Sequence, residues 1–169
     1  LKATGHTDSD FRKPFIAVAN SWNEIAPGHV HLDKIANHVK NGIFENGGIP
    51  FEFDTIAICD GFTHGHLGMK YVLPSREIIA DSIEVMIQSQ CFDAWVGIAS
   101  CDKTVPAMLM AAMRLNIPFI MVTGGAMLPG YVEGVPSDSC VAYEAVTRSI
   151  TEKMPEERVK LIEDHCFPG

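Results

Sequence analysis

Four short segments of the chain consist almost entirely of apolar residues and are rich in β-branched side chains. These segments are residues 15–19, 55–59, 94–99 and 119–123. Continuous apolar runs are typical of strands that are covered on both faces, as in parallel sheets, whereas a strand with one wet face alternates. The four runs therefore predict strands in the interior of a largely parallel sheet.

Segments with helical periodicity lie between and after these runs. Apolar positions spaced three or four residues apart predict helices over residues 31–45, 75–90, 104–115, 137–152 and 155–164. Ser75 is placed to cap the second of these helices. The alternation of strand and helix predicts an α/β fold, a three-layer α/β/α domain with a largely parallel sheet. Because no linker or repeat interrupts the sequence, residues 1–169 are predicted to form one domain.

Composition and charge narrow the classes of protein that fit. Apolar residues make up 47% of the chain and charged residues 20%, which is ordinary for a globular domain. A net charge of -8 argues against nucleic-acid binding, which needs a basic face, and no apolar run is long enough to suggest a membrane span. The five cysteines are widely spaced and form no CxxC pair, so reduced thiols in a cytoplasmic protein are expected. Neither end looks like a natural terminus, which suggests a fragment of a longer chain.

Ligands of such sheets bind beyond the carboxyl ends of the strands, and this rule selects four loops. One of them begins at Asp60, directly after the second predicted strand, and contains several glycines together with His64 and His66. Asp60 is therefore a candidate ligand. A turn aspartate is the plainer interpretation, and the spacing of the two histidines favours polar loop residues over metal ligands.

A second loop places three reactive groups side by side. Cys101, Asp102 and Lys103 follow the third predicted strand and bring a thiol, a carboxylate and an amine into one turn. A thiolate suits iron–sulfur clusters or zinc, whereas an aspartate oxygen suits magnesium. The alternative is a structural cysteine followed by a solvated ion pair at the start of a helix. Spacing alone leaves both interpretations open.

Several motifs in a fixed order carry a family resemblance. They are Pro-Gly-His-Val-His-Leu at residues 27–32, Asp-Gly at 60–61, Leu-Pro-Ser-Arg-Glu at 73–77, Ser-Cys-Asp-Lys at 100–103, Leu-Asn-Ile-Pro at 115–118 and Thr-Gly-Gly at 123–125. With these motifs, the chain resembles the dihydroxy-acid dehydratases and the related sugar-acid dehydratases along its whole length.

The resemblance implies cofactors and site residues. Cys101 matches a cysteine that ligates an iron–sulfur cluster, either [2Fe–2S] or [4Fe–4S]. Asp60, Asp102 and Lys103 match Mg²⁺ ligands, the lysine binding as a carbamate. Some members carry a further cluster cysteine where this chain has Gly28. Cys166 lies where another cysteine-rich segment begins, and the family's catalytic serine base belongs to a β-rich domain that would follow this chain.

The implied activity is a hydro-lyase reaction in valine and isoleucine biosynthesis. A 2,3-dihydroxy acid, such as 2,3-dihydroxyisovalerate, loses water and becomes a 2-keto acid. The expected protein is a cytoplasmic homodimer, and residues 1–169 alone are expected to be inactive. The first alternative is a sugar-acid or 6-phosphogluconate dehydratase. The second, from another class, is a cofactor-free domain whose glycine loops bind an anion.

Overall fold

The structure of this chain is a computed structural model that describes residues 1–167 and contains two compact units, Leu1–Gly125 and Ala126–Gly169. The single-domain interpretation stays a prediction. In chain order, the first unit contains η1 (Lys2–Thr4), η2 (Asp10–Arg12), β1 (Phe15–Asn20), α1 (Leu32–Glu45), β2 (Ile49–Asp54), α2 (Asp60–Thr63), η3 (Leu67–Tyr71), α3 (Ser75–Gln90), β3 (Ala94–Ala99), α4 (Thr104–Leu115) and β4 (Phe119–Thr123). The second contains β5 (Gly130–Val132), β6 (Val135–Ser137), α5 (Ser139–Thr151) and α6 (Glu156–His165).

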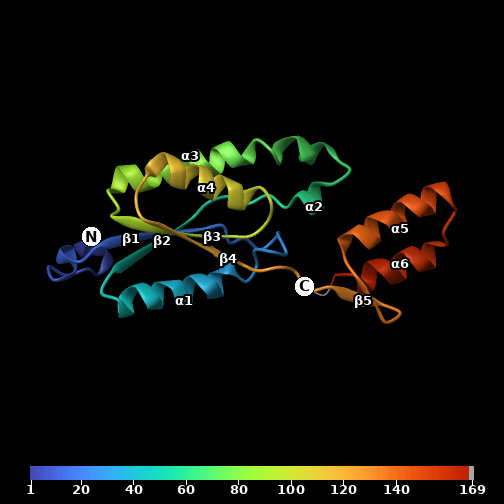
Figure 1. Cartoon of the computed structure of the whole chain (residues 1–169), viewed down its shortest axis with the longest axis horizontal. Coiled ribbons are helices and arrows are strands. Elements are labelled where there is room, and N and C mark those ends of the chain that lie inside the picture. Colours follow the sequence, from blue (N-terminus) through green and yellow to red (C-terminus); the bar gives the residue numbers. More distant parts are fainter. Residues whose placement is uncertain (168–169) are drawn as a thin grey trace. The chain divides into compact units, whose positions relative to one another are not determined.

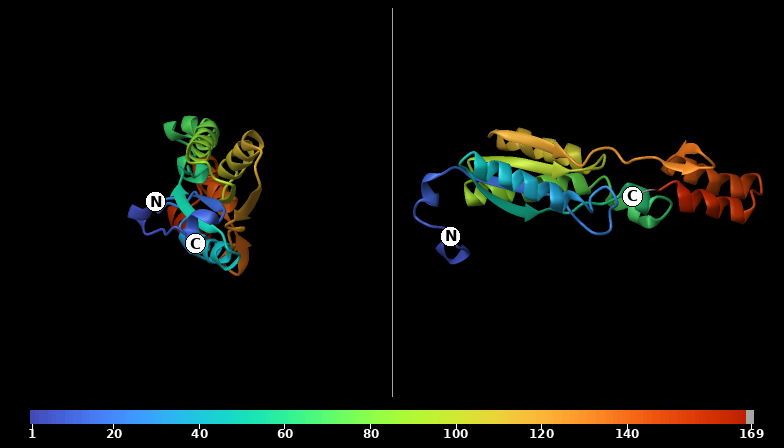
Figure 2. Two further views of the ribbon diagram at one scale, coloured as in Figure 1. Left: turned by 90° about the vertical axis from the view of Figure 1, so that its left-hand side faces the viewer. Right: turned by 90° about the horizontal axis from the view of Figure 1, so that it is seen from below.

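The first unit is built around a four-stranded sheet in the order β2-β1-β3-β4. All three strand pairs are parallel. Helix α1 covers one face of the sheet, and α3 and α4 cover the other (Figure 1 and Figure 2). The predicted α/β fold with three layers is therefore confirmed.

Alternate residues of the central strands supply two cores. Toward α3 and α4, β1 contributes Ala17 and Ala19, which pack with Trp95 of β3. Toward α1, β1 contributes Val18, which packs with Ile98 of β3. Because both faces of β1 and β3 are buried, these strands have the continuous apolar sequences from which they were predicted.

The second strand was predicted in the wrong place. Residues 55–59 are not a strand; β2 is formed instead by Ile49–Asp54, which the sequence analysis did not identify. Its sequence alternates, with Glu52 and Asp54 exposed, and it contains Pro50. Both features are explained by the position of β2 at the edge of the sheet. Its outer edge pairs with no other strand, so a proline without an N–H group is tolerated, and water reaches part of the strand, so acidic residues are tolerated. Asp60 consequently begins the short helix α2 rather than following a strand directly.

The predicted helices all form, with small shifts of their ends. The expected cap at Ser75 is wrong, because Pro74 holds that position and the Ser75 hydroxyl donates to the Val72 carbonyl at 2.6 Å. A side-chain cap is present instead on α5, where Asp138 Oδ1 accepts from the Cys140 amide at 2.9 Å.

The second unit combines an antiparallel β5–β6 hairpin with α5 and α6. The hairpin was not predicted, because strands of three residues are too short to show a period. Val132, Ala142, Ala145, Ile162 and Cys166 form its core, and Cys166 is completely buried. No helix within residues 1–167 combines the length and the apolar character needed to cross a membrane.

Candidate functional site

The site begins where the strand order reverses. From β1 the chain runs outward to β2 and then returns to β3 on the other side of β1. Loops that leave two such strands diverge, and ligands of open α/β sheets bind in the crevice between them. Here Ser21 follows β1, and its amide and hydroxyl both donate to the Ile98 carbonyl of β3, each at 3.0 Å. These bonds fix the start of the loop after β1 against the end of β3.

Cys101 occupies this reversal point. Its φ angle is +68°, which is uncommon for a residue with a side chain. The loop after β1 approaches it through Gly28, where a Cβ atom would lie 3.6 Å from Cys101 Sγ. Since Gly28 has no side chain, no side-chain atom of this residue lies against the Cys101 sulfur.

The surroundings of Cys101 favour the protonated thiol when no metal is bound. Burial, and to a lesser extent the neighbouring Cys59, Asp60 and Asp102, raise the pKa of Cys101 to about 11, against a smaller opposing effect of Lys103. A soft metal would have to displace this proton, because the thiolate is the ligand. Binding of a metal by Cys101 would therefore be favoured at higher pH.

Asp60, the first residue of α2, and Asp102, which follows β3, converge on the amine of Lys103. Lys103 Nζ lies 3.5 Å from Asp60 Oδ2 and forms a close ion pair with Asp102 Oδ2. The hydrogen bond from Lys103 lowers the pKa of Asp102, and the same bond raises the pKa of Lys103. The three residues selected from the sequence as magnesium ligands are thus brought together.

This arrangement fits a hard cation. The Lys103 ammonium already stands as a positive charge between two carboxylates, which is where a divalent ion would find its oxygen ligands. Within residues 1–167, no group of three or more His, Cys, Asp or Glu side chains is arranged to hold a metal ion, so Asp60 and Asp102 would supply only part of the ligand set of a cation. Cys101 can supply one cluster ligand, and others would have to come from elsewhere.

Asn23 connects two of the loops. Its Nδ2 atom donates to the Ala57 carbonyl at 3.3 Å, and its Oδ1 atom accepts from the Ala26 amide at 2.7 Å. Both ends of the side-chain amide are therefore used to hold the loop after β1 against the segment that leads to Asp60. Only the polar type of Asn23, in a loop of the predicted site, hinted at this role.

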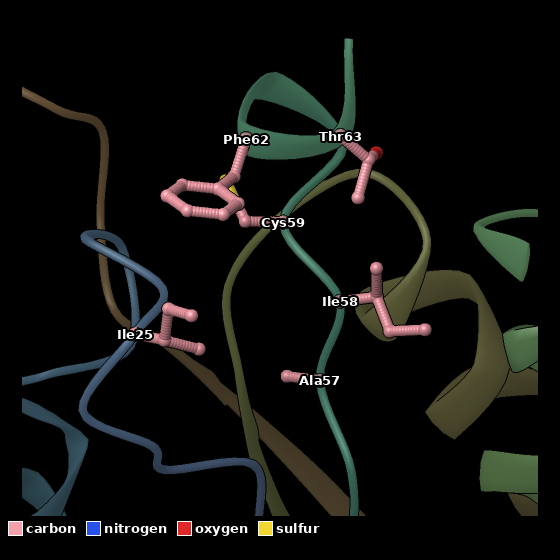
Figure 3. Close-up of a pocket in the computed structure, with 6 residues that line it drawn as sticks. All are labelled: Ile25, Ala57, Ile58, Cys59, Phe62 and Thr63. Carbon is pink, nitrogen blue, oxygen red and sulfur yellow. The ribbon is translucent and has the colours of Figure 1, made fainter. Parts of the chain in front are cut away.

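An apolar pocket lies next to Asp60. Its volume is about 190 Å³, and it is lined by Ile25, Ala57, Ile58, Cys59, Phe62 and Thr63 (Figure 3). Residues 57–59 belong to the apolar run that was predicted to be a buried strand, but they line this pocket instead, and Ile56 of the same run is exposed.

The loop histidines have structural contacts. His66 Nδ1 accepts from the Gly68 amide at 2.9 Å and so caps η3, while its Nε2 atom contacts the Phe62 carbonyl at 3.2 Å. His31 Nε2 contacts the Gly124 carbonyl at 3.0 Å and ties α1 to the loop after β4.

His29 is completely buried beside the first loop. Its Nδ1 atom lies 2.7 Å from the Ser21 carbonyl, so that nitrogen carries the proton of the neutral ring. Nε2 is buried without a hydrogen-bond partner among the described residues, and the Ser100 backbone approaches the ring without hydrogen-bond geometry. Burial lowers the pKa of His29, because protonation would place a charge in a dry position.

The first unit should therefore lose stability in mild acid. Since the pKa of His29 is lower in the folded state, the unfolded chain binds more protons below about pH 6.5, and stability falls as pH falls through that range. We expect a slope of up to about 1.4 kcal/mol per pH unit. Urea unfolding between pH 7.5 and 5 should show a flatter profile for His29→Gln than for the control His38→Gln, which changes an exposed histidine. Equal slopes for both variants would exclude His29 as the source.

Gly124 provides a test of packing at the same edge. A Cβ atom there would overlap Ser100 Oγ and lie 2.8 Å from Leu32 Cδ2. We expect Gly124→Ala to reduce the free energy of unfolding by about 1–3 kcal/mol. Gly42→Ala is the matched control, since Gly42 lies in α1 with open space around it and alanine should stabilise the helix by up to about 1 kcal/mol. If denaturant titration shows that both variants have a lower free energy of unfolding than the wild type, or that both have a higher one, this description of the packing is contradicted.

Comparison with known proteins agrees with the resemblance found in the sequence. Residues 13–169 match the family described as dihydroxy-acid/6-phosphogluconate dehydratase N-terminal. Over 169 residues the chain is 57% identical to dihydroxy-acid dehydratase 1 of Methanosarcina acetivorans, 56% to the dihydroxy-acid dehydratase of Methanococcus vannielii and 57% to that of Methanosarcina barkeri. All of this chain is covered, and it spans 31% of the length of each of these relatives. The chain belongs to the dihydroxy-acid/6-phosphogluconate dehydratase N-terminal family.

Proposed function

We propose that the protein containing this chain dehydrates 2,3-dihydroxy acids, such as 2,3-dihydroxyisovalerate, in branched-chain amino-acid biosynthesis. The proton on C2 and the hydroxyl on C3 leave as water, and the resulting enol becomes the 2-keto acid. The observation that carries the proposal is the Lys103 amine between the carboxylates of Asp60 and Asp102, beside the Cys101 thiol. The names of the relatives support the same substrate class.

Each site residue has a proposed task. Asp60, Asp102 and Lys103, the last as a carbamate, would hold Mg²⁺, and Cys101 would ligate an iron–sulfur cluster. When bound, these groups would supply a Lewis acid for the leaving hydroxyl and stabilise negative charge on the substrate. The chain itself keeps the two positions close, because Cys101 and Asp102 are adjacent in one turn. The base is expected outside residues 1–169, in a protein proposed to be a cytoplasmic homodimer.

A sugar-acid or 6-phosphogluconate dehydratase is the second candidate, and the family description includes it. The apolar pocket beside Asp60 favours a substrate with an alkyl group instead of a polyol chain. The backbone of the glycine loop after β4 argues against the cofactor-free anion-binding alternative. The Gly124 amide already donates to the Ala99 carbonyl at 3.0 Å, so it is not free to bind an anion.

An assay of the full-length protein, purified without oxygen, tests the proposal. We expect visible absorbance from the cluster, turnover of 2,3-dihydroxyisovalerate that needs Mg²⁺, and much slower turnover of 6-phosphogluconate. Faster turnover of 6-phosphogluconate would favour the second candidate. A colourless protein whose properties do not change with Mg²⁺ would favour the anion-binding domain.

A further inference from the structure

The pocket beside Asp60 has an open side and a consistent chemical character. Figure 3 shows Ala57, Cys59 and the ring of Phe62 on the side of their segment that looks toward Ile25. Ile25 and Phe62 are 64% and 63% exposed, so a small molecule can reach the pocket from outside the unit. Asp60 lies between Cys59 and Phe62 in the sequence, which places the pocket beside one residue of the proposed magnesium site.

The pocket offers little to a hydroxylated chain. Of its six lining residues, only Cys59 and Thr63 carry a heteroatom in the side chain. The Thr63 hydroxyl donates to the Asp60 carbonyl at 3.2 Å and lies 3.5 Å from Met69 Sδ, so it is already used within the loop. A thiol is a weak donor. Hydroxyl groups placed here would lose their water without gaining equivalent hydrogen bonds.

We propose that this pocket binds the alkyl group on C3 of the substrate and is the place where the enzyme selects branched aliphatic dihydroxy acids over polyols. The inference rests on the proposed function. The polar end of the substrate belongs with Asp60, Asp102 and Lys103, and the alkyl group then extends toward Ala57 and Ile25. Asn23 maintains this geometry, since it holds Ala26, next to Ile25, and Ala57 through the hydrogen bonds described above.

The test compares three acids that differ only in their alkyl groups. They are 2,3-dihydroxypropanoate, 2,3-dihydroxy-3-methylbutanoate and 2,3-dihydroxy-3-methylpentanoate. Ala57→Leu in the full-length protein fills the pocket, and one methylene in such a pocket changes kcat/KM by about 10- to 200-fold. We expect at least a tenfold loss of kcat/KM for the two branched acids and less than a threefold loss for the unbranched one. Ile56→Ala is the control, because this exposed neighbour does not line the pocket and should leave the ratios unchanged.

A second variant keeps the inference testable if Ala57→Leu does not fold. Ile25→Ala enlarges the pocket from its exposed side, and we expect it to shift the preference at least threefold toward the methylpentanoate. An equal loss of kcat/KM on all three acids, or unchanged ratios in Ile25→Ala, would overturn the alkyl pocket and leave the proposed function standing. Absence of turnover of all three acids by the wild-type protein would instead overturn the proposed function, and the pocket's role with it.

Discussion

Replacing Cys101 with serine in the full-length protein is expected to remove both the visible absorbance of the cluster and the activity. Serine keeps the size of the side chain but offers a hard, mostly protonated hydroxyl, which is a poor ligand for iron in such a cluster. Loss of a Lewis acid worth several kcal/mol corresponds to a drop in turnover of about 1,000-fold or more. The fold should survive, because Cys101 lies in a turn and is only half-buried.

Cys91→Ser is the matched control, since Cys91 is exposed at the end of α3. Iron content, absorbance and turnover should be measured on the same oxygen-free preparation of each variant. Cys101→Ser should lose all three, whereas Cys91→Ser should keep all three. Full iron content and normal turnover in Cys101→Ser would eliminate this residue as a cluster ligand, and the turn would then be structural.

Strands could be predicted where their residues form an apolar run, and this includes β4, although β4 lies at an edge of the sheet with Ile120 exposed and is not the interior strand that was expected. β1 and β3 are central and buried on both faces, so their sequences show an unbroken apolar run. β2 is an edge strand with a proline and two exposed acids, and its pattern resembled a loop more than a strand. The apolar run of residues 55–59 was predicted to be a buried strand, but Ile56 is exposed and residues 57–59 line a pocket, which a run of this length cannot distinguish from a strand.

The sequence pointed to the loops of the candidate site but not to the contacts within it. Cys101 and Lys103 stood out because they follow a predicted strand that forms, whereas Asp60 was selected after residues 55–59, which form no strand. Neither the positive φ of Cys101 nor the approach of Gly28 to its sulfur can be expected from residue propensities. The brace formed by Asn23 joins loops 34 residues apart, so local sequence could not reveal it.

The second large effect is expected from Lys103→Arg. Arginine keeps the positive charge and can still pair with Asp60 and Asp102, so the stability of the unit should change by less than about 0.5 kcal/mol. The guanidinium stays protonated at neutral pH, so it does not form a carbamate and remains a cation where Mg²⁺ would bind. We therefore expect loss of magnesium-dependent turnover by about 1,000-fold or more, with the cluster absorbance retained. Lys40→Arg is the control, because Lys40 also forms an ion pair, with Glu52, outside the site.

The carbamate itself should depend on the metal. Carbon dioxide reacts with a neutral amine, but the hydrogen bond to Asp102 raises the pKa of Lys103 and so keeps it as an ammonium. Mg²⁺ between Asp60 and Asp102 would repel that ammonium and favour the neutral amine, and the carbamate would then add an oxygen ligand. With ¹³C-labelled carbon dioxide, NMR of the wild-type protein should show a carbamate signal that grows with Mg²⁺ and disappears on chelation. A signal of the same size in Lys103→Arg would assign the carbamate to another amine and remove Lys103 from the magnesium site.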